Sequence, residues 1–194
     1  RLDSTDMLYV SRDGVHMEFV GSAFRDSTPE YDSVDESGRE SVDGQFTLVN
    51  PSIIWHGGRF WLLGNHHNCD VDNVVCLVAS SSTDLRSWTK QTIIRVPVED
   101  DLPPSNGKDF DAVAADWAED PVTHKVYAVV SLGNYGAFHG KKGDDMRPYL
   151  IPFTSLQANN VVPSKAVRIH LPYKDDHDRI DGSLYFENGK AFYS

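Results

Sequence analysis

The stretch VNPSIIWHGGRFWLLGN, from Val49 to Asn65, decides the fold. It sets the polar triplet Asn50-Pro51-Ser52 ahead of an apolar run, a Gly-Gly turn and a second run rich in aromatic residues. Short β-branched or aromatic runs bounded by turn residues are typical of β-strands. The same layout closes the chain in RIDGSLYFENGKAFYS, where Asp181-Gly182-Ser183 forms the triplet. The sequence therefore predicts the same hairpin at two places.

A third hairpin with the same spacing lies between these two. The basic residues after the three tight turns, Arg59, Lys125 and Lys190, are separated by 66 and 65 residues. Nine residues before each basic residue stands a polar side chain, and we call these three the strand heads: Asn50, Asp116 and Asp181. A fixed period of this kind indicates a repeat architecture.

A second element also repeats. SRDGVHM, from Ser11, and STDLRSW, from Ser82, share the pattern Ser-x-Asp-Gly/Leu-x-x-Met/Trp.

The apolar runs predict an all-β fold with almost no helix. Four strands are predicted in the first unit: 51–56, 59–64, 74–80 and 91–96. Four antiparallel strands in each repeat are the layout of a β-propeller blade, and the alternative is a β-sandwich of short strands. The propeller is favoured because it explains the matched polar heads, which would begin inner strands near 51–56, 111–119 and 180–187.

The predicted propeller is incomplete, with about two full blades and two part-blades. The units are 1–44 (outer strands of a preceding blade and an acidic loop), 45–106 (blade headed by Asn50), 107–174 (blade headed by Asp116) and 175–194 (inner hairpin headed by Asp181). The chain is therefore interpreted as a fragment of a longer protein. Unpaired strand edges are expected near Met7–Val10 and Ala191–Ser194, covered by another copy, another chain or the remainder of the propeller.

The first strands of neighbouring blades line a common channel, so the three strand heads are expected to point into one cavity. Loops 66–72 and 133–139 return to the same face and are expected to form its wall. The candidate substrate-binding residues are Asn50, His66, His67, Asn134, Tyr135, Phe138 and His139.

Composition limits the partners. The net charge is −11 and no basic patch is visible, which argues against nucleic acid. No apolar run approaches the roughly 18 residues of a membrane helix. Cys69 and Cys76 either remain free thiols, which we favour, or form one disulfide. The segment from His66 to Asp72 contains metal-ligand residue types but no known ligand spacing, so no metal or cofactor is expected, although a structural cation is allowed.

The sequence over residues 45–194 resembles glycoside hydrolase family 43, a family of five-bladed β-propellers. NPSIIWHGGRFWLLG is similar to the family's Asp-Pro-Ser opening, with Asn50 in place of Asp, and Ser82-x-Asp84-Leu85-x-x-Trp88 matches its turn. VAADWAEDPVTHK resembles the next blade, with Asp116 as the acid of a Trp-Ala-Pro-Asp motif that lacks the Trp and the Pro. Ile180-Asp181-Gly182-Ser183-Leu184 matches the following one, with Gly182 in place of Pro.

The resemblance implies a secreted or cell-surface enzyme that hydrolyses arabinose- or xylose-type polysaccharides with inversion. An inverting site needs a base that activates water and an acid that protonates the leaving oxygen. By resemblance Asn50 stands at the base position, Asp181 tunes the acid, and the acid itself, a Glu, is expected beyond residue 194. A register shifted by one blade would instead make Asp116 the tuning residue and Asp181 the acid-blade residue. We expect Asp116 and Asp181 to be the catalytic carboxylates of this chain.

Two other readings stay open because Asn50 cannot accept a proton at neutral pH. The chain is then a carbohydrate-binding propeller with a degenerate site, or an interaction scaffold. For Asp116 and Asp181 the structural alternative is a carboxylate that ties the start of a strand to backbone amides.

Overall fold

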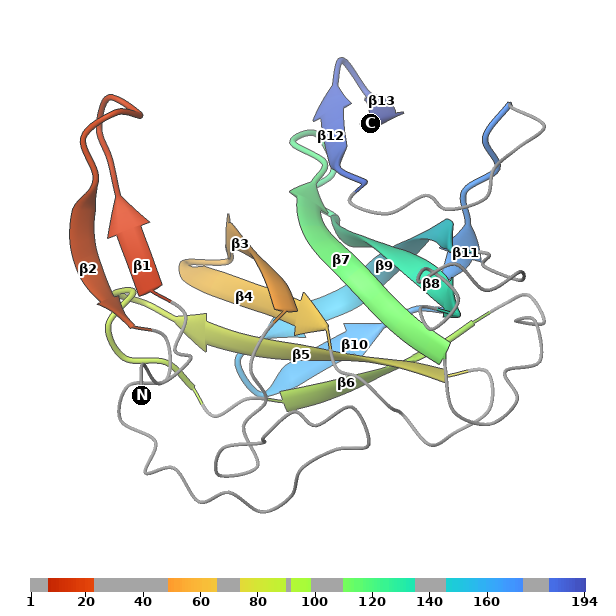
Figure 1. Ribbon diagram of the computed structural model, residues 1–194, viewed down its shortest axis with the longest axis horizontal. Coiled ribbons are helices and arrows are strands. Elements are labelled where there is room, and N and C mark those ends of the chain that lie inside the picture. Colours follow the sequence, from red (N-terminus) through yellow and green to blue (C-terminus); the bar gives the residue numbers. More distant parts are fainter. Residues whose placement is uncertain are drawn as a thin grey trace.

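The computed structural model describes residues 7–22, 49–65, 74–89, 92–98, 110–134, 146–172 and 182–194 (Figure 1). These ranges contain strands and turns and no helix, so the predicted all-β class is confirmed. The strands are β1 (Met7–Val10), β2 (Glu18–Ser22), β3 (Val49–His56), β4 (Arg59–Asn65), β5 (Val74–Ser82), β6 (Thr92–Pro97), β7 (Phe110–Glu119), β8 (Val126–Asn134), β9 (Arg147–Gln157), β10 (Asn160–Pro163), β11 (Val167–Arg168), β12 (Leu184–Glu187) and β13 (Lys190–Tyr193).

Two antiparallel sheets form the body of the chain. Strands β3, β4, β5 and β6 pair in sequence order, and so do β7, β8, β9 and β10, while β11 adds to β9. The four strands predicted in the first unit are confirmed within two residues at each end. The third predicted inner strand is shorter than expected, because β12 begins at Leu184 and the preceding described residues, 182 and 183, are not in a strand.

Two hairpins flank the sheets, β1–β2 and β12–β13 (Figure 1). The first packs Leu8 against Leu62 and Val78 of the β3–β6 sheet. The second packs Leu184 and Phe186, with others, against the β7–β10 sheet. The four units therefore stack in sequence order, and among the described residues β1 and β13 each have one hydrogen-bonded neighbour strand.

Both faces of the central strands are buried, which explains their continuous apolar runs. On β4, Trp61 and Leu63 face the β7–β10 sheet, whereas Leu62 faces the β1–β2 hairpin. On β8, Ala128 and Val130 face the β3–β6 sheet, whereas Val129 faces the β12–β13 hairpin. Side chains alternate across a strand, so a strand between two apolar layers needs apolar residues at every position.

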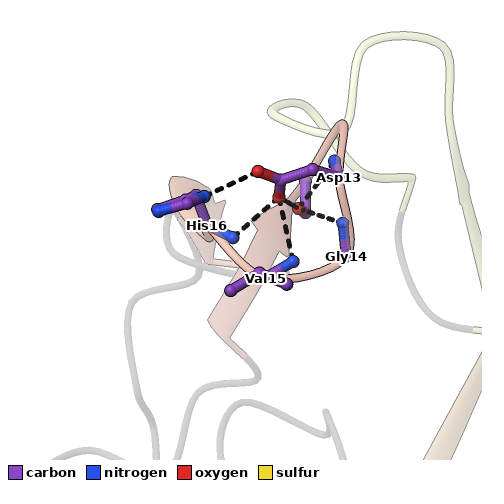
Figure 2. Close-up of polar contacts among 5 residues, drawn as sticks. Asp13, Gly14, Val15 and His16 are labelled. Atoms are coloured by element: carbon purple, nitrogen blue, oxygen red, sulfur yellow. Dashed lines mark hydrogen bonds and ion pairs between the residues drawn. The ribbon is translucent and has the colours of Figure 1, made fainter.

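The repeated Ser-x-Asp pattern forms turns with matching hydrogen bonds at both places. In the turn between β1 and β2, Asp13 accepts hydrogen bonds from the backbone of Val15 and His16, at 2.9 and 2.8 Å, and from Ser11 Oγ at 3.0 Å (Figure 2). In the turn after β5, Asp84 accepts from the backbone of Arg86 and Ser87 at 2.8 Å and from Ser82 Oγ at 3.0 Å.

The fourth residue of each turn has a left-handed backbone. Gly14 has φ 76° and Leu85 has φ 62°. In both turns the serine hydroxyl accepts the backbone N–H of this residue, at 2.8 Å for Gly14 and 2.9 Å for Leu85. Glycine adopts such a φ without cost, whereas other residues are strained there.

Gly14→Ala should therefore destabilise the protein by about 1 kcal/mol. A Cβ at Gly14 would meet no atom within 4 Å, so the cost is conformational and involves no clash. Urea unfolding of the variant measures it. Val15→Ala, at an exposed position of the same turn, is the control and should stay within about 0.5 kcal/mol of wild type. Equal stability of Gly14→Ala and wild type would contradict the turn geometry.

Candidate functional site

The carboxylate of Asp116 joins three segments that are far apart in the sequence. Its Oδ1 accepts a hydrogen bond from Ser52 Oγ at 2.6 Å, and its Oδ2 accepts one from Ser183 Oγ at 2.7 Å. Ser52 belongs to β3, Asp116 to β7, and Ser183 immediately precedes β12. Hydrogen bonds from hydroxyls to a carboxylate are short and are stronger than those between neutral groups. The three predicted inner strands therefore meet at this carboxylate, which binds the fourth residue of β3 and the residue before β12 from the seventh residue of β7.

Ser52 has a second hydrogen bond that fixes its direction. Its Oγ accepts the backbone N–H of Trp117 at 3.2 Å while its proton goes to Asp116. A serine hydroxyl has one proton to donate. Ser52 therefore connects the β3 strand to two consecutive residues of β7.

The partners of Asp116 are the third residues of the two polar triplets. The reason is the length of the middle turn. Glu119 pairs with Val126 across a connection of six residues, whereas His56 pairs with Arg59 across a turn of two. Lys125 is the last residue of the six-residue connection, whereas Arg59 is already in a strand, so the residue nine positions before Lys125 lies nearer its turn than Asn50 does. Asp116 is thus level with Ser52 and Ser183, which stand two residues after Asn50 and Asp181.

The structure tests few of the other predicted site residues. Asn50 lies in β3 and Asn134 ends β8, but their side chains are outside the described part. The remaining predicted residues lie outside the described residues: His66, His67, Tyr135, Phe138, His139 and Asp181. Their roles stay predictions.

A second tie joins β3 to β7 at the last residue of each strand, four residues after Ser52 and three after Asp116. Glu119 Oε2 accepts a hydrogen bond from His56 Nδ1 at 2.9 Å, and its Oε1 accepts one from His124 Nδ1 at 2.8 Å. A carboxylate only accepts, so in these bonds each histidine carries its proton on Nδ1. Between the two ties the half-buried Ile54 packs into the apolar interface of the two sheets. β3 and β7 are therefore held together by side chains at two places.

The surroundings of Glu119 set its charge state. Burial raises the pKa of Glu119, but the hydrogen bonds from His124 and His56, with the attraction of the two imidazoles, outweigh it and lower the pKa below 4.5. A carboxyl whose pKa is lower in the folded state than in the unfolded state stabilises the fold when the pH is above the unfolded-state pKa. This stabilisation is lost as the pH falls through the folded-state pKa.

Glu119→Gln should therefore reduce the stability most near neutral pH and least in acid. The difference in unfolding free energy between wild type and variant should shrink as the pH falls below about 4.5, the ordinary pKa of Glu. Urea unfolding between pH 3 and 7 measures this difference. Other carboxyls with lowered pKa, such as Asp84 and Asp120, titrate in both proteins and cancel.

Glu187→Gln is the matched control, because Glu187 is an exposed glutamate at the corresponding end of β12. Its difference from wild type should be small at every pH. A pH-independent loss in Glu119→Gln would contradict the ionic tie.

Gly182 departs from the motif pattern for a structural reason. It is buried beside the ring of Tyr193, and a Cβ at this position would overlap that ring. Tyr193 lies on β13, which pairs with β12. Tyr193 thus fills the space that a proline ring would need at the start of β12.

Cys76 is disulfide-bonded, and the chain has one other cysteine, Cys69. The favoured prediction of free thiols is therefore wrong, and the disulfide alternative is confirmed for Cys76. Sequence spacing did not decide between them, because seven residues allow either state. Among the described residues no three His, Cys, Asp or Glu side chains are grouped so that they could hold a metal ion.

Sequence reasoning missed the residues that make the two ties. Ser52 and Ser183 carried a usable signal, since each is the third residue of a polar triplet. His56 and Glu119 carried none, because both stand at ordinary strand ends before a turn.

Comparisons with known proteins give the following. No family model and no curated protein matches the chain. Among solved structures, a GH43 β-1,3-galactosidase with galactodeoxynojirimycin aligns over 72% of this chain and 37% of its own, at 19% identity and a TM-score of 0.42. The native arabinanase of Bacillus subtilis aligns over 75% of this chain and 46% of its own, at 18% identity and a TM-score of 0.46. The chain thus spans less than half the length of either protein.

In the described ranges no helix is long and apolar enough to cross a membrane.

Proposed function

We propose that this chain contributes neighbouring blades of a β-propeller and part of the site of a carbohydrate-active protein. The function we favour is inverting hydrolysis of arabinose- or xylose-type polysaccharides. One observation carries the proposal: Asp116 accepts hydrogen bonds from both Ser52 and Ser183, so β3, β7 and the residue that precedes β12 meet at one carboxylate. The motifs that resemble family 43 contain these three residues.

Convergence matters because glycosidic hydrolysis needs groups from different strands at one place. In inverting enzymes the two carboxyl groups are about 6.5–9.5 Å apart, which leaves room for a water molecule. Asn50 and Asp181 each stand two residues from a hydroxyl that binds Asp116. Two residues of chain span at most about 7 Å, so both positions are within reach of a common substrate.

The roles follow the resemblance. Asp181 is proposed to tune the general acid, and Asn50 to occupy the base position. His66, His67, Asn134, Tyr135, Phe138 and His139 are proposed to contact the sugar, with the aromatic residues stacking on its ring. Extracellular or cell-surface localisation belongs to the same proposal, since the substrate is a polysaccharide.

A second candidate function is carbohydrate binding without hydrolysis. Asn50 favours it, because a carboxamide can bind a sugar hydroxyl but cannot serve as a base at neutral pH. The substitution Asn50→Asp separates the two functions. If the site is degenerate, the wild type shows no hydrolysis and the variant should gain a detectable rate. If the protein is an enzyme that uses another base, the substitution should change the rate little.

Asp181→Asn in the complete protein should reduce hydrolysis of aryl arabinosides or xylosides by at least about a hundredfold, the usual scale of acid–base assistance. The unfolding midpoint should change little, because the substitution preserves shape. Initial rates with the aryl glycosides measure the effect, and Glu187→Gln, near the other end of the same hairpin strand, is the matched control.

Wild-type hydrolysis that Asp181→Asn leaves intact would contradict the proposed role. Sugar binding without any hydrolysis by the wild type would favour the second candidate. Neither binding nor hydrolysis of arabinose- or xylose-type oligosaccharides would reject both.

A further inference from the structure

We infer that Asp116 is a positioning residue: it holds Ser52 of β3 and Ser183, next to β12, against β7 and so sets the separation of residues 50 and 181, and it does not exchange a proton with substrate. The inference rests on the proposed function only for what residues 50 and 181 do. The tie itself is independent of that function.

Both oxygens of the Asp116 carboxylate are in use. The bonds from Ser52 Oγ at 2.6 Å and Ser183 Oγ at 2.7 Å come from opposite neighbours, one on each side of β7. Both serines donate their single proton to Asp116 in this arrangement. A general acid or base must instead direct a carboxylate oxygen at the reacting group within hydrogen-bond distance. The geometry of Asp116 is that of a two-sided tie.

The tie matters because the three strands share no backbone ladder. β3, β7 and β12 belong to three different sheets, and their pairing partners are β4, β8 and β13. Strands within a sheet are held in register by their hydrogen bonds. Between sheets the register depends on side-chain packing and on contacts such as those of Asp116.

The position of the tie makes it relevant to the site. Ser52 is the third residue of the triplet that begins with Asn50, and Ser183 is the third residue of the triplet that begins with Asp181. A shift of either strand along β7 would move its strand head by the same amount. Misplacement of a reacting group by about 1 Å can reduce a rate by about a hundredfold.

The substitution Asp116→Asn separates positioning from proton transfer. An asparagine at 116 can accept the proton of Ser52 with Oδ1 and donate from Nδ2 to Ser183 Oγ, because a hydroxyl can also accept. It therefore keeps both contacts, but it cannot act as an acid or a base. Asp116→Ala removes both contacts.

The complete protein with Asp116→Ala should unfold roughly 5–10 °C below wild type, as expected for the loss of two hydrogen bonds to a charged group. Asp116→Asn should lose less than half of that. Amide hydrogen exchange in peptides covering 49–56 and 182–187 should rise in Asp116→Ala and stay near wild type in Asp116→Asn. Exchange in a peptide covering 146–157, on β9, should be unchanged in both variants.

Asp116→Ala should lower the affinity for arabinose- or xylose-type oligosaccharides at least tenfold, and Asp116→Asn should largely restore it. If the wild type is an enzyme, its rate of hydrolysis should change in the same way. Ser52→Ala combined with Ser183→Ala should reproduce the effect of Asp116→Ala, and adding Asp116→Ala to that pair should cost little more.

Two results would overturn the inference. The first is a loss of hydrolysis of at least a hundredfold in Asp116→Asn with unchanged unfolding and exchange, which would show a catalytic carboxylate. The second is unchanged exchange at 49–56 and 182–187 in Asp116→Ala, which would show that no tie is needed. If the wild type binds no sugar, the proposed function fails, and the unfolding and exchange results still decide the role of Asp116.

Discussion

The arrangement of this chain depends on how the first strands of successive sheets are held together. β3 and β7 lie side by side without shared backbone hydrogen bonds, since each pairs only within its own sheet. Ser52 donates to Asp116, and four residues further along β3 His56 donates to Glu119. Each tie uses a carboxylate, and hydrogen bonds to a charged group stabilise by about 1.5–3 kcal/mol, more than neutral ones. Apolar packing holds the sheets together, whereas the ties determine how far one strand can slide along the other.

Much of the fold was predictable because burial leaves a clear pattern in the sequence. Strands β3 to β6 lie close to their predicted ranges, since each apolar run ends at Gly, Pro, Asn or Asp. The Ser-x-Asp turns were predictable because the side chains that build them are local. The position of Asp116 along its strand, compared with those of Asn50 and Asp181, was not predictable, because it depends on the length of the connection between Glu119 and Val126. Counting from a basic residue assumes that all three turns are equally long.

The site was predictable only in outline. A period of about 65 residues indicates that polar residues meet, but it does not give their partners. Ser52, Ser183 and the His56–Glu119 contact join residues more than 60 positions apart, and no local pattern marks such a pair. Gly182 is a similar case, because its reason is the ring of Tyr193 on the partner strand. From the residue types alone, a glycine in place of the proline would be interpreted as a sign of a degenerate motif.

The motifs thus have two kinds of residue with separate tasks. Ser52, Asp116 and Ser183 connect the strands, and the proposed reacting positions, 50 and 181, stand beside them. Under the proposed function, a substitution at residue 50 alters the chemistry of the site and leaves the three connecting residues in place.

A crystal structure of the complete protein tests the central claim most directly. The account predicts that the Asp116 carboxylate accepts hydrogen bonds from Ser52 and Ser183, and that the side chains of Asn50 and Asp181 enter one cavity beside it. A structure in which Asp116 contacts neither serine, with Asn50 and Asp181 on different faces, would contradict it.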